Sequence, residues 1–395
     1  MKTIPLIFVL VIIYGCNTRN VSQDGVSNEV IDSTEVIDVS NAFIQNPIEI
    51  EDYLHDIKII PLETNDMSIL SDVDQIVVSK EYVYVKDDYE NGGVAIFDIN
   101  GNFIKRLPQG AAPHEIASAE SIYVEPQSGN LFVCDQASYK VIEYSPSGEY
   151  INNYYIGKMV GDLAIDNNKF FFVQRSLQNE SGFFVFSSTD SLFESFADIY
   201  LGKEPFAYMQ PKYIEYCGDG FNVMLPWVNT VYCYKQGKMF KKYFVKNINA
   251  DNVDYSAYEK SFDMTKNLPN GTWLYSGTIM DTQKMNIILF RGMYDQLMQV
   301  LRNKKTKDCY TVKITNSIYH YVNCRSVCSY DDNMFCGVLL PEDIKNEEDP
   351  DWAWDGSNPH NLISAEDMEK LKAVKPDDNP LVIIYRIDLD RPNKK

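Results

Sequence analysis

The sequence contains few histidines and few basic residues. Only four of its 395 residues are His, which leaves few candidates for metal ligands or general bases. Lys and Arg number 36 against 56 Asp and Glu, so the formal net charge is −20. Because an acidic surface repels phosphate backbones, nucleic acid is excluded as an expected partner. The sequence also lacks a nucleophile elbow, a His-Glu-x-x-His segment and a phosphate-binding loop, the motifs of several large enzyme classes.

Long apolar runs are absent as well. No segment reaches the roughly 20 apolar residues that a membrane-spanning helix requires. Hydrophobic residues nevertheless make up 45% of the chain, enough for a sizeable core, which excludes a disordered protein or a low-complexity fibre.

The first residues resemble a bacterial lipoprotein signal. Lys2 precedes the apolar run Ile4–Tyr14, and Gly15 stands directly before Cys16. We expect residues 1–15 to be a signal peptide, cleaved before Cys16, and the Cys16 thiol to be the site of lipid attachment. An ordinary secretory peptide with an incidental cysteine is the alternative.

The segment after the signal differs in composition from the rest of the chain. Residues 16–35 are polar and acidic, which predicts a flexible tether. Residues 36–395 are assigned to one folded body. Together these segments predict a lipid-anchored protein of the bacterial cell envelope, facing the periplasm or lying on the outer-membrane surface, whose anchor makes the only membrane contact.

Seven cysteines remain after Cys16, an odd number that cannot pair completely. Most are expected to be small buried hydrophobic residues. Cys328 and Cys336 are the exception, because a turn at 331–333 would place them opposite each other across a hairpin, where a disulfide is possible. His320 and Cys324, which are spaced with Cys328 like metal ligands, lie in a segment with strand composition and cannot converge on one ion from a single strand.

A repeated unit determines the predicted fold. In 82–104 and again in 130–151, a strand ends at an Asp, a second strand ends at an aromatic residue, and a turn with Gly leads into a third strand. Looser copies follow to the end of the chain, without a confident amphipathic helix between them. A period of about 40–50 residues with about four strands per repeat is typical of a β-propeller.

The sequence thus predicts an all-β fold, a six-bladed β-propeller with four-stranded antiparallel blades. The expected blades span about 71–108, 116–157, 160–200, 212–246, 270–314 and 320–390. Residues 57–62 are predicted to form an N-terminal strand that pairs with 381–389 and closes the last blade. The acidic insertion 341–380 in that blade is expected to carry a short surface helix over 365–373, because Ser364 and Asp367 resemble a capping box.

From about residue 30 to 390, the chain resembles the six-bladed β-propeller lipoproteins of Bacteroidetes, relatives of the NHL-repeat propellers. The matching segments are Ile60–Thr64, 96–104 (IFDINGNFI), the loop Gly110–Glu115 and Asn379–Tyr385. In that loop, alanine and histidine replace glycines that the family usually has. The resemblance implies a fold and export, but no agreed activity.

The resemblance also implies where a ligand would bind. In such propellers the second strand of each blade ends at one mouth of the central channel. The residues expected there are Asp87, Asp135, Arg175, Trp227 and Arg291. Arginine suits a carboxylate or phosphate and Trp can stack on a ring, so this rim predicts a site for a small polar ligand. Salt bridges that cap the channel are the alternative.

Two further groups of residues carry weaker signals. His114 and Glu115 lie on the same expected face, where His114 is a general-base candidate or a solvated loop residue. In the insertion, Trp352 and Trp354 either contact a glycan or protein or anchor the insertion on the propeller. No cofactor is expected. Calcium is the one candidate metal, at the acidic run Asp349, Asp351, Asp355 and Gly356, which lacks the spacing of an EF-hand.

We therefore predict a binding or scaffold module, a monomeric propeller whose partner is a cell-envelope protein or a small polar ligand. A hydrolase or lyase acting in the channel is the first alternative. A glycan-binding lipoprotein is the second.

Overall fold

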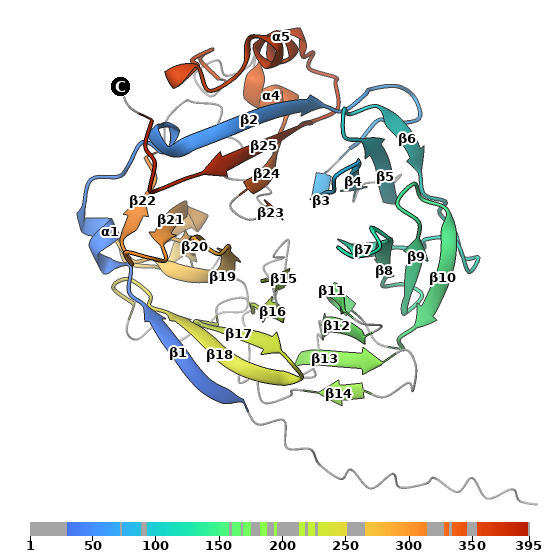
Figure 1. Cartoon of the computed structure of the whole chain (residues 1–395), viewed down its shortest axis with the longest axis horizontal. Coiled ribbons are helices and arrows are strands. Elements are labelled where there is room, and N and C mark those ends of the chain that lie inside the picture. Colours follow the sequence, from blue (N-terminus) through green and yellow to red (C-terminus); the bar gives the residue numbers. More distant parts are fainter. Residues whose placement is uncertain are drawn as a thin grey trace, which may run out of the picture.

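Short strands follow one another around a ring in the computed structural model (Figure 1). The structure describes residues 30–71, 73–87, 93–157, 160–166, 169–174, 182–187, 193–195, 213–217, 220–225, 228–250, 265–313, 328–331, 334–345 and 354–393. Each sheet extends from an inner strand near the centre of the ring to an outer strand near its outer edge.

Four sheets each consist of four consecutive strands that pair antiparallel with their neighbours. They are β3 (Val73–Val78), β4 (Tyr82–Asp87), β5 (Gly93–Asp98) and β6 (Phe103–Arg106); β7 (Ala119–Val124), β8 (Leu131–Asp135), β9 (Lys140–Tyr144) and β10 (Tyr150–Tyr155); β11 (Val160–Asp166), β12 (Lys169–Gln174), β13 (Gly182–Ser187) and β14 (Phe193–Ser195); and β19 (Leu274–Asp281), β20 (Met285–Arg291), β21 (Leu297–Asn303) and β22 (Cys309–Thr311).

A fifth sheet closes the ring. It joins β23 (Cys328–Asp331), β24 (Met334–Leu339) and β25 (Leu381–Ile387) to β2 (Leu54–Pro61). β2 and β25 pair antiparallel, as the sequence predicted for the closing strand. β23 and β24 place Cys328 opposite Cys336, also as predicted. The Cys328 side chain lies outside the described part, so a disulfide there stays a prediction.

The remaining sheet contains a strand that the sequence analysis did not foresee. β15 (Ile214–Tyr216), β16 (Gly220–Val223), β17 (Thr230–Lys235) and β18 (Lys238–Val245) are antiparallel, but β1 (Ile31–Ile37) adds to β18 as a fifth, parallel strand. The predicted fold class, uniform four-stranded antiparallel blades, is therefore wrong. Residues 31–35 were also assigned to the tether, and they lie in β1 instead.

The core of the propeller lies between the sheets. Each of the six buried clusters joins residues of two neighbouring sheets; for example, one brings Val231 and Tyr243 against Ile279 and Ile288. Because a middle strand is covered on both faces, β8 is buried along its whole length, whereas the rim strand β10 is largely exposed. Removal of apolar surface from water between sheets stabilises the ring.

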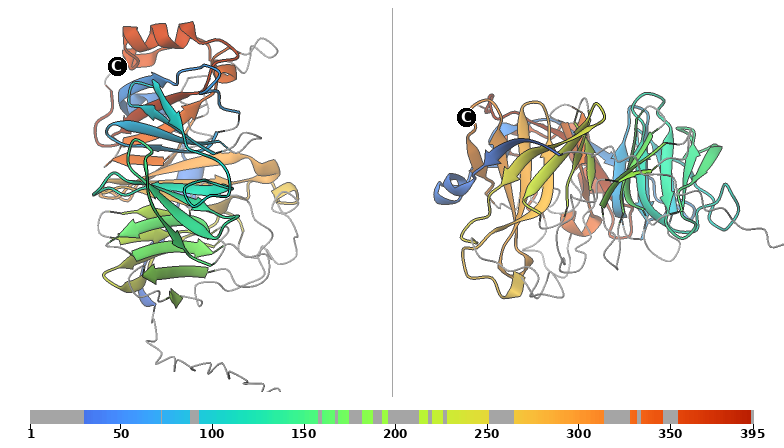
Figure 2. Two further views of the ribbon diagram at one scale, coloured as in Figure 1. Left: turned by 90° about the vertical axis from the view of Figure 1, so that its right-hand side faces the viewer. Right: turned by 90° about the horizontal axis from the view of Figure 1, so that it is seen from below.

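The insertion of the last blade is part of this core. Helix α5 (Ala365–Ala373) begins at Ser364, whose hydroxyl accepts a hydrogen bond from the Asp367 N–H, which confirms the predicted cap. Ile363 and Leu371 are buried against residues of β2 and β25. α5 lies at the rim of the ring (Figure 2), and the short helix α4 (Pro341–Ile344) leads into it. The remaining short helices are α1 (Ser40–Ile44), η1 (Ile50–Tyr53), η4 (Met293–Asp295) and η6 (Pro359–Asn361). Among the described helices, none has the length and apolarity to cross a membrane.

Candidate functional site

A surface pocket opens where β19 begins. Helix α1, the segment after β18 and the residues just before β19 enclose a cavity of about 440 Å³. Two aromatic side chains line it, Phe43 and Trp273, with Lys246, Asn247 and Asn249 on other parts of its wall. A cavity of this size accommodates a small molecule.

Close packing fixes the indole of Trp273. Its ring centroid lies 5.7 Å from that of Phe43, which in turn meets the buried Phe290 ring edge-on. Gly292 approaches the indole so closely that a Cβ atom there would lie 2.9 Å from the ring. A side chain at position 292 would therefore displace the indole, so this glycine keeps the aromatic wall in place.

Hydrogen bonds fix the polar side of the pocket. Asn247 accepts a hydrogen bond from the Tyr275 N–H at 2.8 Å, and the Asn249 amide donates to the Gly271 carbonyl at 3.0 Å. Ile248 and Trp273 exchange two backbone hydrogen bonds, which hold the two segments side by side. The polar wall is therefore rigid at the backbone level.

One ion pair stands at the pocket. The Lys246 ammonium lies 3.2 Å from a carboxylate oxygen of Asp38, and both side chains are about half exposed. Hydrogen bonds from the hydroxyl and the backbone N–H of Ser40 lower the pKa of Asp38, so its carboxylate stays charged at neutral pH. The pocket thus combines a flat aromatic wall with amide groups and one cation, a combination suited to a polar ligand with a ring.

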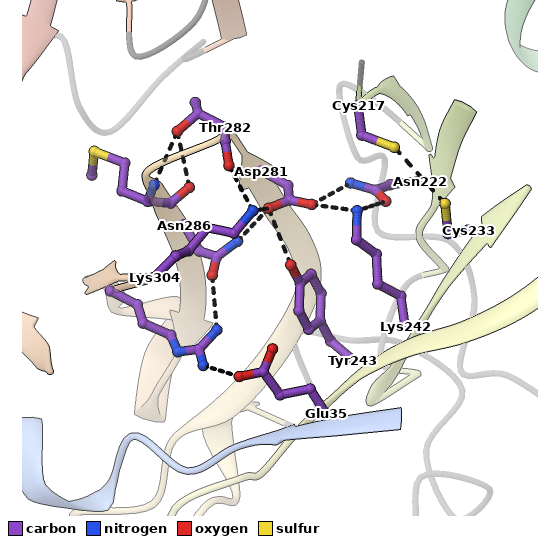
Figure 3. Close-up of polar contacts among 12 residues, drawn as sticks. Glu35, Cys217, Asn222, Cys233, Lys242, Tyr243, Asp281, Thr282, Asn286 and Lys304 are labelled. Carbon is purple, nitrogen blue, oxygen red and sulfur yellow. Dashed lines mark hydrogen bonds and ion pairs between the residues drawn. The ribbon is translucent and has the colours of Figure 1, made fainter. Parts of the chain in front are cut away.

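A second group of polar residues lies at the other end of β19 and is buried (Figure 3). The Asp281 carboxylate, 1% exposed, accepts hydrogen bonds from Lys242 at 2.6 Å and from Lys304 at 2.9 Å. The amides of Asn222 and Asn286 also donate to it, at 3.1 and 2.6 Å. Asn222 and Lys242 come from the sheet that contains β15–β18, so this cluster joins that sheet to the sheet of β19–β22.

Opposite charges in the cluster shift each other's pKa. Burial alone would raise the pKa of Asp281, but the ammonium groups of Lys242 and Lys304 outweigh burial and lower it. Burial likewise opposes protonation of Lys242, yet Asp281 raises the pKa of that amine above its ordinary value. Arg302 extends the network from Asn286 to Glu35 on β1. Since both carboxylate oxygens of Asp281 have donors within the chain, the cluster acts as a bridge between sheets.

Three of the residues predicted at the channel mouth occupy equivalent positions in their sheets. Asp87, Asp135 and Arg291 each end the second strand of a sheet and pair with the first residue of its inner strand. Their alignment in the repeats is therefore confirmed. Arg175 and Trp227, the other two predicted rim residues, lie outside the described part of the chain.

The two aspartates predicted at the channel mouth are buried and accept hydrogen bonds from the chain itself. Asp135 accepts from the N–H groups of Ala117 and Ser118 at 3.1 and 3.0 Å. Asp87 accepts from the Ser71 N–H, just before β3, at 3.3 Å and lies 3.4 Å from Arg106. Asp87 is 2% exposed and Asp135 is fully buried. These contacts fix the backbone just before each inner strand begins. A ligand-binding role for these residues stays a prediction.

The loop residues His114 and Glu115 do come together. Their Nε2 and Oε1 atoms are 4.0 Å apart, and the His114 side chain is half exposed. The other carboxylate oxygen of Glu115 accepts from the Ala112 N–H at 2.9 Å, which shapes the loop. A general-base role for His114 remains untested.

The tryptophans of the insertion are described in part. Trp354 packs against the core cluster that includes α5, and its indole N–H donates to the Ser357 carbonyl at 3.0 Å. It therefore anchors the insertion, one of its two expected roles. Trp352 lies outside the described residues, as do Cys16, Asp349 and Asp351. Asp355 is exposed and accepts from the Ser357 N–H. In the described part of the chain, no three His, Cys, Asp or Glu side chains form a group that could hold a metal ion.

The sequence analysis missed both Trp273 and Asp281. Trp273 is the second of the four tryptophans in the sequence and stands at the start of a repeat, which is the signal that could have drawn attention to it. Asp281 ends the first strand of its repeat, whereas the repeat alignment emphasised the ends of second strands.

Comparisons with known proteins identify relatives of the fold. Residues 34–386 match the family described as "Domain of unknown function (DUF4934)". No curated protein is significantly similar in sequence. The solved structure of a Bacteroides fragilis protein, described as exported, aligns with a TM-score of 0.67 at 14% identity and covers 91% of this chain and 100% of its own.

Two further solved structures are more distant. A Bacteroides vulgatus protein of the duf4221 family aligns with a TM-score of 0.46 at 11% identity, covering 86% of this chain and 99% of its own. Streptogramin B lyase aligns with a TM-score of 0.40 at 10% identity, covering 73% of this chain and 96% of its own. Of these three structures, the Bacteroides fragilis protein alone aligns with a TM-score above 0.5, and at 14% identity this likeness establishes the fold alone.

Proposed function

The chain belongs to the DUF4934 family, whose description assigns no function, and from the geometry of the pocket we propose that it binds a small polar ligand. The observation that carries this proposal is the cavity of about 440 Å³ between Phe43 and Trp273 on one side and Lys246, Asn247 and Asn249 on another. Its aromatic wall suits the apolar face of a sugar ring, and its amides suit hydroxyl groups. A saccharide is therefore the first ligand class to test.

The proposed place of action is the bacterial cell envelope. The Bacteroides fragilis protein that shares this fold is described as exported, and residues 1–16 resemble a lipoprotein signal. Acylation of Cys16 would anchor the propeller, with residues 17–30 between the lipid and β1. A Cys16→Ala variant should move from the membrane fraction to the soluble fraction. Equal membrane association of this variant and the wild type would rule out lipid attachment at Cys16.

Binding is tested with purified protein and a panel of neutral, N-acetylated and acidic oligosaccharides. At least one sugar should raise the melting temperature of the wild type and leave that of Trp273→Ala unchanged. Tyr155→Ala is the matched control, because Tyr155 is an aromatic residue, 73% exposed, on β10 of another sheet. If no sugar shifts the wild type, or if the shift survives in Trp273→Ala, the pocket does not bind saccharides.

A scaffold function of the insertion is tested by point substitutions and not by deleting the insertion. Trimming residues 341–380 would remove Ile363 and Leu371 from the buried core, so loss of a partner could simply reflect unfolding. Substitutions at exposed positions of the insertion, such as Glu366 and Glu369, leave the core intact. A crosslinked envelope protein lost on replacing these two residues with lysine would favour the scaffold function.

A further inference from the structure

Two cysteine side chains meet beside the Asp281 cluster. Cys217 directly follows β15 and Cys233 lies in β17, and their Sγ atoms are 3.8 Å apart (Figure 3). The other cysteines whose side chains are described belong to other sheets: Cys134, Cys309 and Cys336.

Strand pairing places the two cysteines on one face of the sheet. Asn222 of β16 pairs with Glu215 on one side and with Cys233 on the other. Side chains two residues apart on a strand share a face, so Cys217 lies on the same face as Glu215. Asn222, on this face, donates to Asp281 of the neighbouring sheet, so the thiols belong to the same interface between sheets.

From this contact we propose that Cys217 and Cys233 form a reversible disulfide by thiol–disulfide exchange. A disulfide bond is about 2.05 Å long, so the sulfur atoms must approach each other by roughly 1.8 Å. Cys217 stands outside the strand, where its N–H closes the β15–β16 hairpin on the Gly220 carbonyl. Because β16 lies between β15 and β17, the link requires the hairpin end that carries Cys217 to bend over β16 toward Cys233.

The difference in exposure assigns the two roles. Cys217 is half-buried and can meet an external disulfide, whereas Cys233 is only 6% exposed. The Cys217 thiol gives its proton to solvent, and its sulfur attacks one sulfur of the oxidant disulfide, which releases the first thiol. The Cys233 sulfur then loses its proton and attacks the Cys217 sulfur, which breaks the mixed disulfide and releases the second thiol. Two electrons pass from the pair to the oxidant.

The surroundings of Cys217 slow its reaction with a disulfide at neutral pH. The hydrogen bond with Cys233, together with burial, raises the pKa of Cys217, and the nearby Lys242 ammonium only partly opposes this effect. Little thiolate therefore exists at neutral pH, so exchange is slow there and becomes faster as the pH rises. Such a modification fits a protein of an oxidising compartment.

The test uses the full mature chain, reduced and then exposed to an excess of oxidised glutathione. Peptide mapping by mass spectrometry should find a Cys217–Cys233 link, and the melting temperature should rise by roughly 5 °C, because the link closes a loop of about 16 residues. Cys217→Ser and Cys233→Ser should each abolish the rise. Cys134→Ser, at a buried cysteine of β8, is the control and should keep it.

Mapping of the wild-type protein keeps the test informative if a variant fails to fold. A link between Cys328 and Cys336 alone would show oxidation at a different hairpin and would overturn the proposal. Both thiols remaining reduced after prolonged exposure to oxidised glutathione at pH 9 would overturn it as well.

Discussion

The two ends of β19 show how one interface between sheets serves two purposes. At the first end, just before Leu274, Trp273 lines an open pocket. At the other end of the strand, Asp281 is buried and surrounded by donors. At the buried end, the polar side chains form hydrogen bonds and ion pairs with one another. The open end holds its aromatic rings by close packing and leaves a cavity beside them, so stability and binding are expected to depend on different residues.

The largest effect should come from the buried end. Asp281→Ala leaves the ammonium groups of Lys242 and Lys304 without their shared carboxylate, which should cost about 3–5 kcal/mol of unfolding free energy. Chemical denaturation measures this loss. Asp355→Ala, at an exposed aspartate, is the control and should cost much less. A loss below about 1 kcal/mol for Asp281→Ala would show that the cluster does not join the sheets.

Acid should weaken the same cluster. The pKa of Asp281 in the folded protein lies below its unfolded value, so its contribution to stability is present above the unfolded pKa and is lost as pH falls through the folded pKa. The free energy of unfolding of the wild type should therefore fall more steeply below about pH 4 than that of Asp281→Asn. Parallel pH profiles for the two proteins would contradict this assignment.

At the open end, Gly292→Ala should disturb the pocket more than the fold. The added methyl group meets the Trp273 ring, which should cost about 1–3 kcal/mol and shift the fluorescence of that indole. In a Trp273→Ala background the same substitution should cost little unfolding free energy, because the indole ring that the methyl group would meet is absent. An equal cost in both backgrounds would mean that another contact explains the glycine.

The smallest stability effect is expected at Lys246. Its pair with Asp38 is about half exposed, so Lys246→Gln should change the unfolding free energy by less than about 1 kcal/mol. Binding of an acidic oligosaccharide should weaken if this ammonium contacts it. A large stability loss would show that Lys246 belongs to the fold and not to the pocket.

Much of the fold could be predicted because the strands and turns of each sheet are visible in the residue pattern of a single repeat. The alternation of apolar strands and Gly-containing turns fixed the alignment of Asp87 and Asp135, and IKIIPL at 57–62 indicated the closing strand. β1 was missed because Ile31–Ile37 has the polar composition of a tether and gains its strand structure only by pairing with β18. Tertiary contacts can override local composition in this way.

The candidate site was harder to predict for a related reason. Phe43 and Trp273 are distant in the sequence and meet only because β1 leads α1 across the rim to the start of β19. Asp281 and Lys242 belong to different repeats, and nothing within either repeat indicates that they pair. The pattern within one repeat therefore predicts its sheet, but it does not predict the pocket or the buried cluster that form between two sheets.

Fluorescence tests most directly whether the pocket beside Trp273 binds a small polar ligand. A protein in which Trp227, Trp352 and Trp354 are replaced by phenylalanine retains Trp273 as its sole tryptophan. Titration with the oligosaccharide panel should give a saturable change in its emission for at least one sugar, and Asn249→Ala should weaken that binding. An emission that no sugar changes, or a change that Asn249→Ala and Lys246→Gln leave intact, would show that the pocket does not bind these sugars.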